Sequence, residues 1–121
     1  MATRGWEGVT SRTRGRGSKF HNVPTTVNGQ RFDSQREATY YAGLEARAAA
    51  GEITSLRRQV AFPLLCPFED RTVYVCSYVA DFVYVERGVR HVVDAKGHRT
   101  PMFTLKARWL YLQDGIVIEE V

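Results

Sequence analysis

Two runs rich in valine and tyrosine flank a short glycine-containing break between Tyr78 and Lys96. β-Branched and aromatic runs around such a break predict an antiparallel β-hairpin. If Arg87-Gly88 is a two-residue loop, the register places Asp81 directly opposite Asp94. Lys96 then lies on the same face as Asp94, because side chains at i and i+2 share a face. A three-residue loop would shift the register by one residue and put the two aspartates on opposite faces.

Two facing aspartates require a compensating cation, since cross-strand Cβ atoms lie about 4.5–5.5 Å apart and like charges there are destabilising. Lys96 and a divalent metal are the two candidates. Asp81, Asp94 and the backbone carbonyl of Ala95 offer the oxygen ligands that Mg²⁺ or Mn²⁺ prefers. Lys96 could orient or deprotonate a water, or stabilise charge on a phosphate. The set indicates phosphodiester hydrolysis, whereas the simpler interpretation is two strand-edge charges with Lys96 as an ordinary partner of Asp94.

Upstream of the hairpin, Ser34 is followed three residues later by Glu37, which is the capping-box pattern of a helix start. A helix is predicted from about residue 35 to residue 50, ended by Gly51. Glu37 lies on the same stripe of this helix as Tyr41 and Leu44, so it points toward whatever that stripe packs against. Glu37 is therefore either only a cap or a third acid that reaches the two aspartates.

Turn and capping signals predict the remaining elements. The Asn28-Gly29 pair predicts a small hairpin. We expect a connector over 53–58, strands over 59–65, 71–85 and 90–96, a turn over 67–70, a helix over 102–113 that begins after Thr100 and Pro101, and a buried strand over 116–118. A helix between the third and fourth strands is what a crossover to a parallel neighbour requires. The fold class expected is α/β (α+β), with a mixed central sheet flanked by helices.

The positive charge is concentrated at the start of the chain. Five basic residues against one acidic residue within residues 1–20 account for the whole formal net charge of +4. The segment is rich in Gly, Ser and Arg without apolar periodicity, so residues 1–20 are predicted to be a disordered basic arm and residues 21–121 a single domain. Basic residues along a flexible arm suit nucleic-acid phosphates, and the alternative is a solubilising tail. The candidates for DNA binding here are Arg12, Arg14, Arg16 and Lys19.

Four further basic side chains follow the third strand. His98 and Arg99 lie in the predicted loop, and Lys106 and Arg108 lie on the predicted second helix. Each could contact DNA, and each could equally be an ordinary solvated side chain.

The sequence contains no apolar run near the ~20 residues of a membrane span. It also has no charged start followed by an apolar core that would indicate a signal peptide. We therefore expect a cytoplasmic protein. Cys66 and Cys76 lack metal-site spacing and are predicted to be buried free thiols.

The segments YVADFVY and VVDAKG resemble the PD-(D/E)-x-K motif of the restriction-endonuclease-like nuclease superfamily. The expected order of elements also resembles the αβββαβ core of that superfamily. The resemblance implies that Asp81 and Asp94 bind the metal and that Lys96 serves the hydrolytic water. It also implies that Glu37 completes the acidic cluster and that Gln59 is an auxiliary residue. Ala80 stands where the name-giving proline would be, a position that varies across the superfamily.

Within the superfamily, FDSQREATYY, YVADFVY and VVDAKG with a basic N-terminus most resemble short, often phage-encoded nucleases near the Holliday junction resolvases. This resemblance implies a Mg²⁺-dependent endonuclease for branched DNA in phage recombination, with Mn²⁺ as a substitute metal. Two symmetric cuts need two sites, so it also implies a homodimer working in the cytoplasm of a bacterial host. The alternatives are a nickase or a transposon- or packaging-associated nuclease that needs a partner protein, and an inactive nucleic-acid-binding module of the same fold.

Overall fold

The computed structural model describes residues 24–27, 29–95 and 98–121, which form two helices and two sheets. In chain order the elements are β1 (Thr25–Val27), β2 (Gln30–Phe32), α2 (Gln35–Ala49), β3 (Thr54–Phe68), β4 (Arg71–Glu86), β5 (Val89–Asp94), α3 (Pro101–Asp114) and β6 (Ile118–Glu120). β1 and β2 form a small antiparallel ribbon, and the other strands form a sheet in the order β3-β4-β5-β6. β6 runs parallel to β5, while the other pairs are antiparallel. The expected α+β class and mixed sheet are confirmed.

The hairpin between β4 and β5 has the two-residue loop that the sequence predicts. Glu86 pairs with Val89 across the loop, and the same register continues as far as Phe82 opposite Val93. Arg87 and Gly88 both adopt positive φ, at 53° and 78°. Positive φ at both central residues defines the hairpin turn whose twist matches that of the flanking strands. One step further along this register, Asp81 faces Asp94.

Both helices begin at the capping residues expected from the sequence. The Ser34 hydroxyl accepts a hydrogen bond from the Glu37 backbone N–H at 3.1 Å. The Thr100 hydroxyl likewise accepts from the Phe103 N–H at 3.0 Å, and α3 ends at Gly115, which has a left-handed φ of 72°. Neither helix in the described part of the chain is long and apolar enough to cross a membrane.

Several boundaries differ from the prediction because strand pairing extends beyond the local pattern. The expected connector over 53–58 is instead mostly the start of β3, since Thr54 pairs with Val85. The expected turn over 67–70 narrows to Glu69 and Asp70 for the same reason. The last strand lies at residues 118–120 rather than 116–118, and it is largely exposed because it forms an edge of the sheet. Cys66, expected to be buried, is exposed because it lies near the end of β3, beyond the core.

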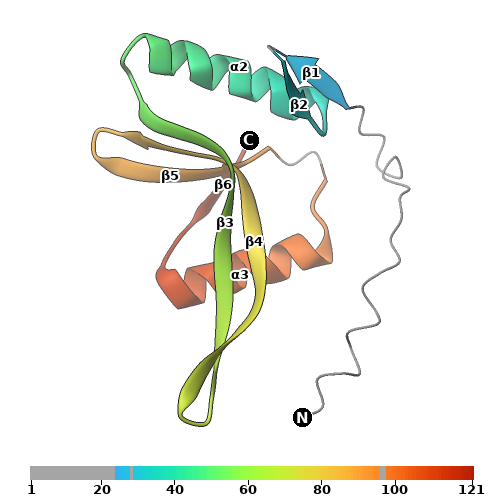
Figure 1. Cartoon of the computed structure of the whole chain (residues 1–121), viewed down its shortest axis with the longest axis vertical. Helices are drawn as coiled ribbons and strands as arrows, with labels where there is room; N and C mark the ends of the chain where they lie inside the picture. Colours follow the sequence, from blue (N-terminus) through green and yellow to red (C-terminus); the bar gives the residue numbers. More distant parts are fainter. Residues whose placement is uncertain (1–23, 28, 96–97) are drawn as a thin grey trace.

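Two hydrophobic clusters cover opposite faces of the sheet. Adjacent residues of a strand point to opposite faces, and Val92 packs in the cluster with α3 while Val93 packs in the cluster with α2. Figure 1 shows α2 and the β1–β2 ribbon near one end of the molecule, with α3 crossing the β3–β4 hairpin further down. The α3 cluster contains Phe62, Leu64, Tyr78, Ala80, Val83, Val92, Phe103 and Leu110, and the α2 cluster contains Phe32, Ala38, Leu44, Ile53, Phe82, Tyr84 and Val93.

The regular alternation of faces along β4 breaks at Asp81. Ala80 and Val83 both belong to the α3 cluster, although strict alternation would place them on opposite faces. On the neighbouring strand β3, Gln59 has a left-handed φ of 52°. Arg58 pairs with Phe82 and Val60 pairs with Ala80, but Gln59 between them has no pair in this ladder. The two strands thus rotate together at this level, which is where the predicted site residues lie.

Candidate active site

Asp81 and Asp94 lie side by side at the ends of two neighbouring strands. The Asp81 carboxylate accepts a hydrogen bond from the backbone N–H of Ala95 at 2.9 Å, which ties it to the end of β5. Asp94 is only 2% exposed, and Asp81 is half-buried. The predicted juxtaposition of the two carboxylates is therefore present.

The shared burial of the two acids changes the protonation of Asp81. Burial, and next the charge of Asp94, raise the pKa of Asp81 from 3.8 to about 7. The hydrogen bond from Ala95 acts in the opposite direction and does not offset them. A carboxyl group with such a pKa holds a proton for about half the time at neutral pH, and a cation placed between the two acids would release it.

Tyr78 is a site residue that the sequence pattern missed. Its hydroxyl donates a hydrogen bond to the Asp94 carboxylate with an oxygen–oxygen distance of 2.5 Å, and the side chain is only 4% exposed. Burial and this bond to Asp94 raise the pKa of Tyr78 far above its ordinary value, so the hydroxyl remains a donor. The bond fixes the orientation of the Asp94 carboxylate.

Glu37 reaches the same cluster from the first turn of α2. Its side chain is buried, and its carboxylate accepts a hydrogen bond from the Gln59 amide at 3.1 Å. The same amide nitrogen lies 3.4 Å from an oxygen of Asp81, so Gln59 bridges the two acids. Burial, followed by the neighbouring charge of Asp33, raises the pKa of Glu37. The capping contact of Glu37 uses its backbone N–H, so it leaves the carboxylate available to the cluster.

Arg58 is a second residue that the sequence analysis overlooked, because its segment was expected to be a connector. Its guanidinium lies 3.8 Å from the Glu37 carboxylate and 4.0 Å from the centre of the Phe32 ring. It also donates hydrogen bonds to the Arg31 carbonyl at 3.0 Å and to the Gln30 side chain at 3.2 Å. The β1–β2 ribbon thereby holds one positive charge beside the acidic cluster.

The residues that could hold a metal are Asp81, Asp94 and the carbonyl of Ala95. Within the described ranges no set of three or more His, Cys, Asp or Glu side chains is arranged as a metal site. Mg²⁺ keeps several of its waters and is commonly held by one or two carboxylates, so the Asp81–Asp94 pair fits its donor chemistry. Lys96 lies outside the described residues, as do the arm residues Arg12, Arg14, Arg16 and Lys19.

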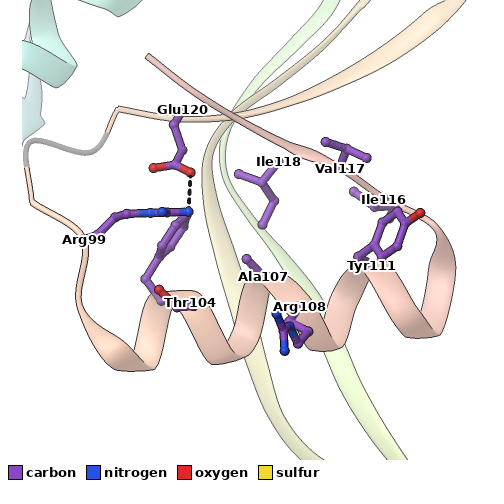
Figure 2. Close-up of a pocket in the computed structure, with 10 residues that line it drawn as sticks. Arg99, Thr104, Ala107, Arg108, Tyr111, Ile116, Val117, Ile118 and Glu120 are labelled. Atoms are coloured by element: carbon purple, nitrogen blue, oxygen red, sulfur yellow. Dashed lines mark hydrogen bonds and ion pairs between the residues drawn. The ribbon is translucent and has the colours of Figure 1, made fainter.

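The structure places the remaining DNA-binding candidates along α3 and the loop before it. Arg99 pairs with Glu120 at 2.9 Å, and Figure 2 shows this contact at one end of a groove of about 390 Å³ between α3 and β6. Lys106 donates to the Ser77 carbonyl at 2.8 Å, so it anchors α3 to β4. His98 and Arg108 are exposed. The structure thus brings Glu37, Gln59, Asp81 and Asp94 together, whereas the described Arg99 and Lys106 have other partners.

The fold and the site define an α+β protein that carries a cluster of buried acids at the open end of a β-hairpin. Residues 17–114 match the family described as "Protein of unknown function (DUF1064)", and the chain belongs to this family. The matched range contains all four residues of the cluster and both helices. No curated protein and no solved structure gives a significant match.

Proposed function

We propose that this protein is a metal-dependent DNA endonuclease with a restriction-endonuclease-like core. The observation that carries the proposal is the convergence of Glu37, Asp81 and Asp94, three acids from two different parts of the chain, in one partly buried cluster. Burying like charges together destabilises a protein, and functional sites are where such arrangements concentrate. The order helix, three antiparallel strands, helix and parallel strand supports the same assignment.

In this proposal each residue has a definite part. Asp81 and Asp94, with the carbonyl of Ala95, hold Mg²⁺, for which Mn²⁺ can substitute. When bound, the ion supplies a water of lowered pKa and stabilises the negative charge that develops on the phosphate. Tyr78 keeps the Asp94 carboxylate oriented, and Gln59 holds the Glu37 carboxylate toward the site.

Lys96 and the basic arm complete the proposed machinery. Lys96 follows the second metal-binding acid by two residues, and its role in the proposal is to orient or deprotonate the attacking water. Residues 1–20 carry the excess positive charge and bind DNA phosphates without regard to sequence. We propose branched DNA, of the Holliday junction type in phage recombination, as the substrate. A homodimer would supply the two active sites that paired cuts require.

The test is cleavage of a labelled four-way junction beside linear duplex and single strand of matched sequence, in Mg²⁺ and in EDTA. Paired, metal-dependent cuts confined to the junction would support the resolvase function. Cutting of all three substrates would indicate a general nuclease. No cutting of any of them would indicate a partner-dependent nuclease or a DNA-binding module.

The matched variants are Asp94→Asn and Glu52→Gln. Asp94→Asn should abolish cleavage and leave DNA binding equal or tighter, since a negative charge near the phosphate is removed. Glu52 is an exposed acid in the turn after α2, and its substitution should change neither property. Cleavage by Asp94→Asn at the wild-type rate would contradict the metal assignment.

A further inference from the structure

The hairpin of β3 and β4 projects past α3, and an apolar groove lies between the two. Figure 1 shows the closed end of this hairpin extending well beyond the helix. We call residues 60–80 of the hairpin the arm. The groove has a volume of about 520 Å³, and its apolar lining comes from Leu65, Cys66 and Pro67 of the arm and from Leu105, Trp109 and Leu112 of α3.

Large apolar side chains gather around this groove in contact with water. Of the eleven exposed large apolar side chains in the described part of the chain, nine lie on the arm or on α3. Leu105 and Leu112 line the groove and are 53% and 75% exposed. Tyr74 pairs with Leu65, so it lies on the groove side of the arm, and it is 60% exposed.

The size of this apolar surface matches what a stable dimer needs. Phe68 at the arm tip is 51% exposed. Together with Tyr74, Leu105 and Leu112, it offers apolar surface beside the groove. At roughly 200 Å² per large side chain, their exposed parts amount to on the order of 450 Å². A stable interface buries about 800 Å² per partner, of which roughly 60% is apolar. Apolar patches of a few hundred Å² are the largest that monomers commonly expose, and they often mark interaction sites.

The charges around the groove favour a second copy of this chain as the occupant. The arm tip carries two exposed acids, Glu69 and Asp70, beside one base, Arg71, whose guanidinium lies 5.6 Å from the centre of the Phe68 ring. The tip therefore keeps one excess negative charge, and the groove is lined by the exposed Arg108. Within the ranges that the structure describes, no salt bridge involves Glu69, Asp70 or Arg108. Strand pairing continues to Phe68 opposite Arg71, with one register shift between Leu64 and Leu65, so the hairpin is paired up to its tip. A protruding acidic, apolar tip and a basic, apolar groove on one molecule are complementary to each other in a two-fold arrangement.

We propose that the chain forms a two-fold dimer in which the arm tip of each copy lies in the α3 groove of the other. The contact places Phe68 in the groove and Glu69 and Asp70 near the partner's Arg108. It leaves the acidic cluster uncovered, because Asp81 lies about 30 Å along β4 from the tip at ~3.3 Å per residue. This contact gives an interface to the homodimer of the proposed function, and it needs neither metal nor DNA, so it can be tested separately from cleavage.

The first test is the oligomeric state of the full chain by sedimentation velocity between 1 and 100 µM in EDTA. Wild type should sediment as a dimer at the higher concentrations. Leu112→Glu places a charge in the groove and should raise the dissociation constant more than about tenfold. Val89→Glu is the matched control, because Val89 is 57% exposed but lies on the β4–β5 hairpin, and it should leave the constant unchanged. Far-UV circular dichroism of both variants checks that they remain folded.

The second test exchanges the charges across the contact. Arg108→Glu alone should weaken the dimer, and the double change Glu69→Lys with Asp70→Lys alone should do the same. Combining the three substitutions should restore an affinity near that of wild type. A wild type that stays monomeric at every concentration, equal effects of Leu112→Glu and Val89→Glu, or a triple variant no better than either parent would each overturn the proposed contact.

Discussion

Replacing Asp81 with asparagine should stabilise the metal-free protein at neutral and alkaline pH. The pKa of Asp81 is about 7 in the folded protein, against an ordinary value of 3.8. Between these values the unfolded chain loses its proton while the folded protein keeps it. The unfolded state thus binds fewer protons, so the free energy of unfolding falls as pH rises through this window and levels off above pH 7. The loss reaches on the order of 4 kcal/mol by pH 8, and about 2–3 kcal/mol of it falls between pH 5 and pH 8.

Urea unfolding of wild type and Asp81→Asn at pH 5 and pH 8, in EDTA, measures this effect. The asparagine can still accept the Ala95 N–H bond, so the variant isolates the charge. Wild type should lose about 2–3 kcal/mol more than the variant between the two pH values. Excess Mg²⁺ at pH 8 should recover part of that loss in wild type only, if the proposed metal site is correct. The exposed acid substitution Glu52→Gln serves as the control. Parallel pH dependence in wild type and Asp81→Asn would refute the assignment of a raised pKa to Asp81.

Three further predictions concern the site, the core and the basic arm. Tyr78→Phe removes the donor to the Asp94 carboxylate and should lower the free energy of unfolding at pH 7 by about 1.5–3 kcal/mol in urea titrations; an unchanged midpoint would show that this bond contributes nothing. Leu110→Ala should lower it by about 2–5 kcal/mol, since Leu110 is fully buried, whereas Met102→Ala at the exposed start of α3 should change it by less than about 0.5 kcal/mol. Deleting residues 1–18 should weaken DNA binding and reduce the salt dependence of the affinity, and an equal salt slope in both proteins would mean that the N-terminal basic segment does not bind phosphates.

The register of the central hairpin could be predicted because it depends on local information. The length of the loop at Arg87 and Gly88 determines which residues face each other, and the loop has the predicted two residues. The position of Asp81 opposite Asp94 follows from counting residues back along both strands from this loop. The starts of both helices were likewise predictable, since a capping side chain bonds to a backbone N–H only three residues away.

Tyr78 could not be found in this way, because its place in the site depends on a break in the strand pattern. Under strict alternation Tyr78 and Asp81 would lie on opposite faces of β4, so Tyr78 could not reach Asp94. The rotation of both strands at Asp81 and Gln59 removes that restriction. A non-glycine residue that adopts positive φ in the middle of a strand has no reliable signature in a single sequence.

Arg58 and the extent of β3 were missed for a different reason. Residues 53–58 show little strand pattern of their own, and it is the pairing of Thr54 with Val85 that makes the segment a strand. The position of Arg58 over the Phe32 ring then depends on contacts with the β1–β2 ribbon, more than twenty residues earlier in the chain. Such long-range contacts are set by the assembled fold and leave no local trace.

The parallel pairing of β6 with β5 has a consequence for the order of events during synthesis. Asp94 pairs with Glu120, and its carbonyl accepts a hydrogen bond from the Val121 N–H at 3.1 Å. The hairpins of β3, β4 and β5 involve neighbouring segments and can form early, whereas β6 can pair only after α3 has been made and has crossed the sheet. On the ribosome, the strand that carries Asp94 therefore gains its second neighbour late. In a nascent chain the acidic cluster would therefore lie on a sheet edge, beside an unpaired Asp94 backbone, until β6 has emerged.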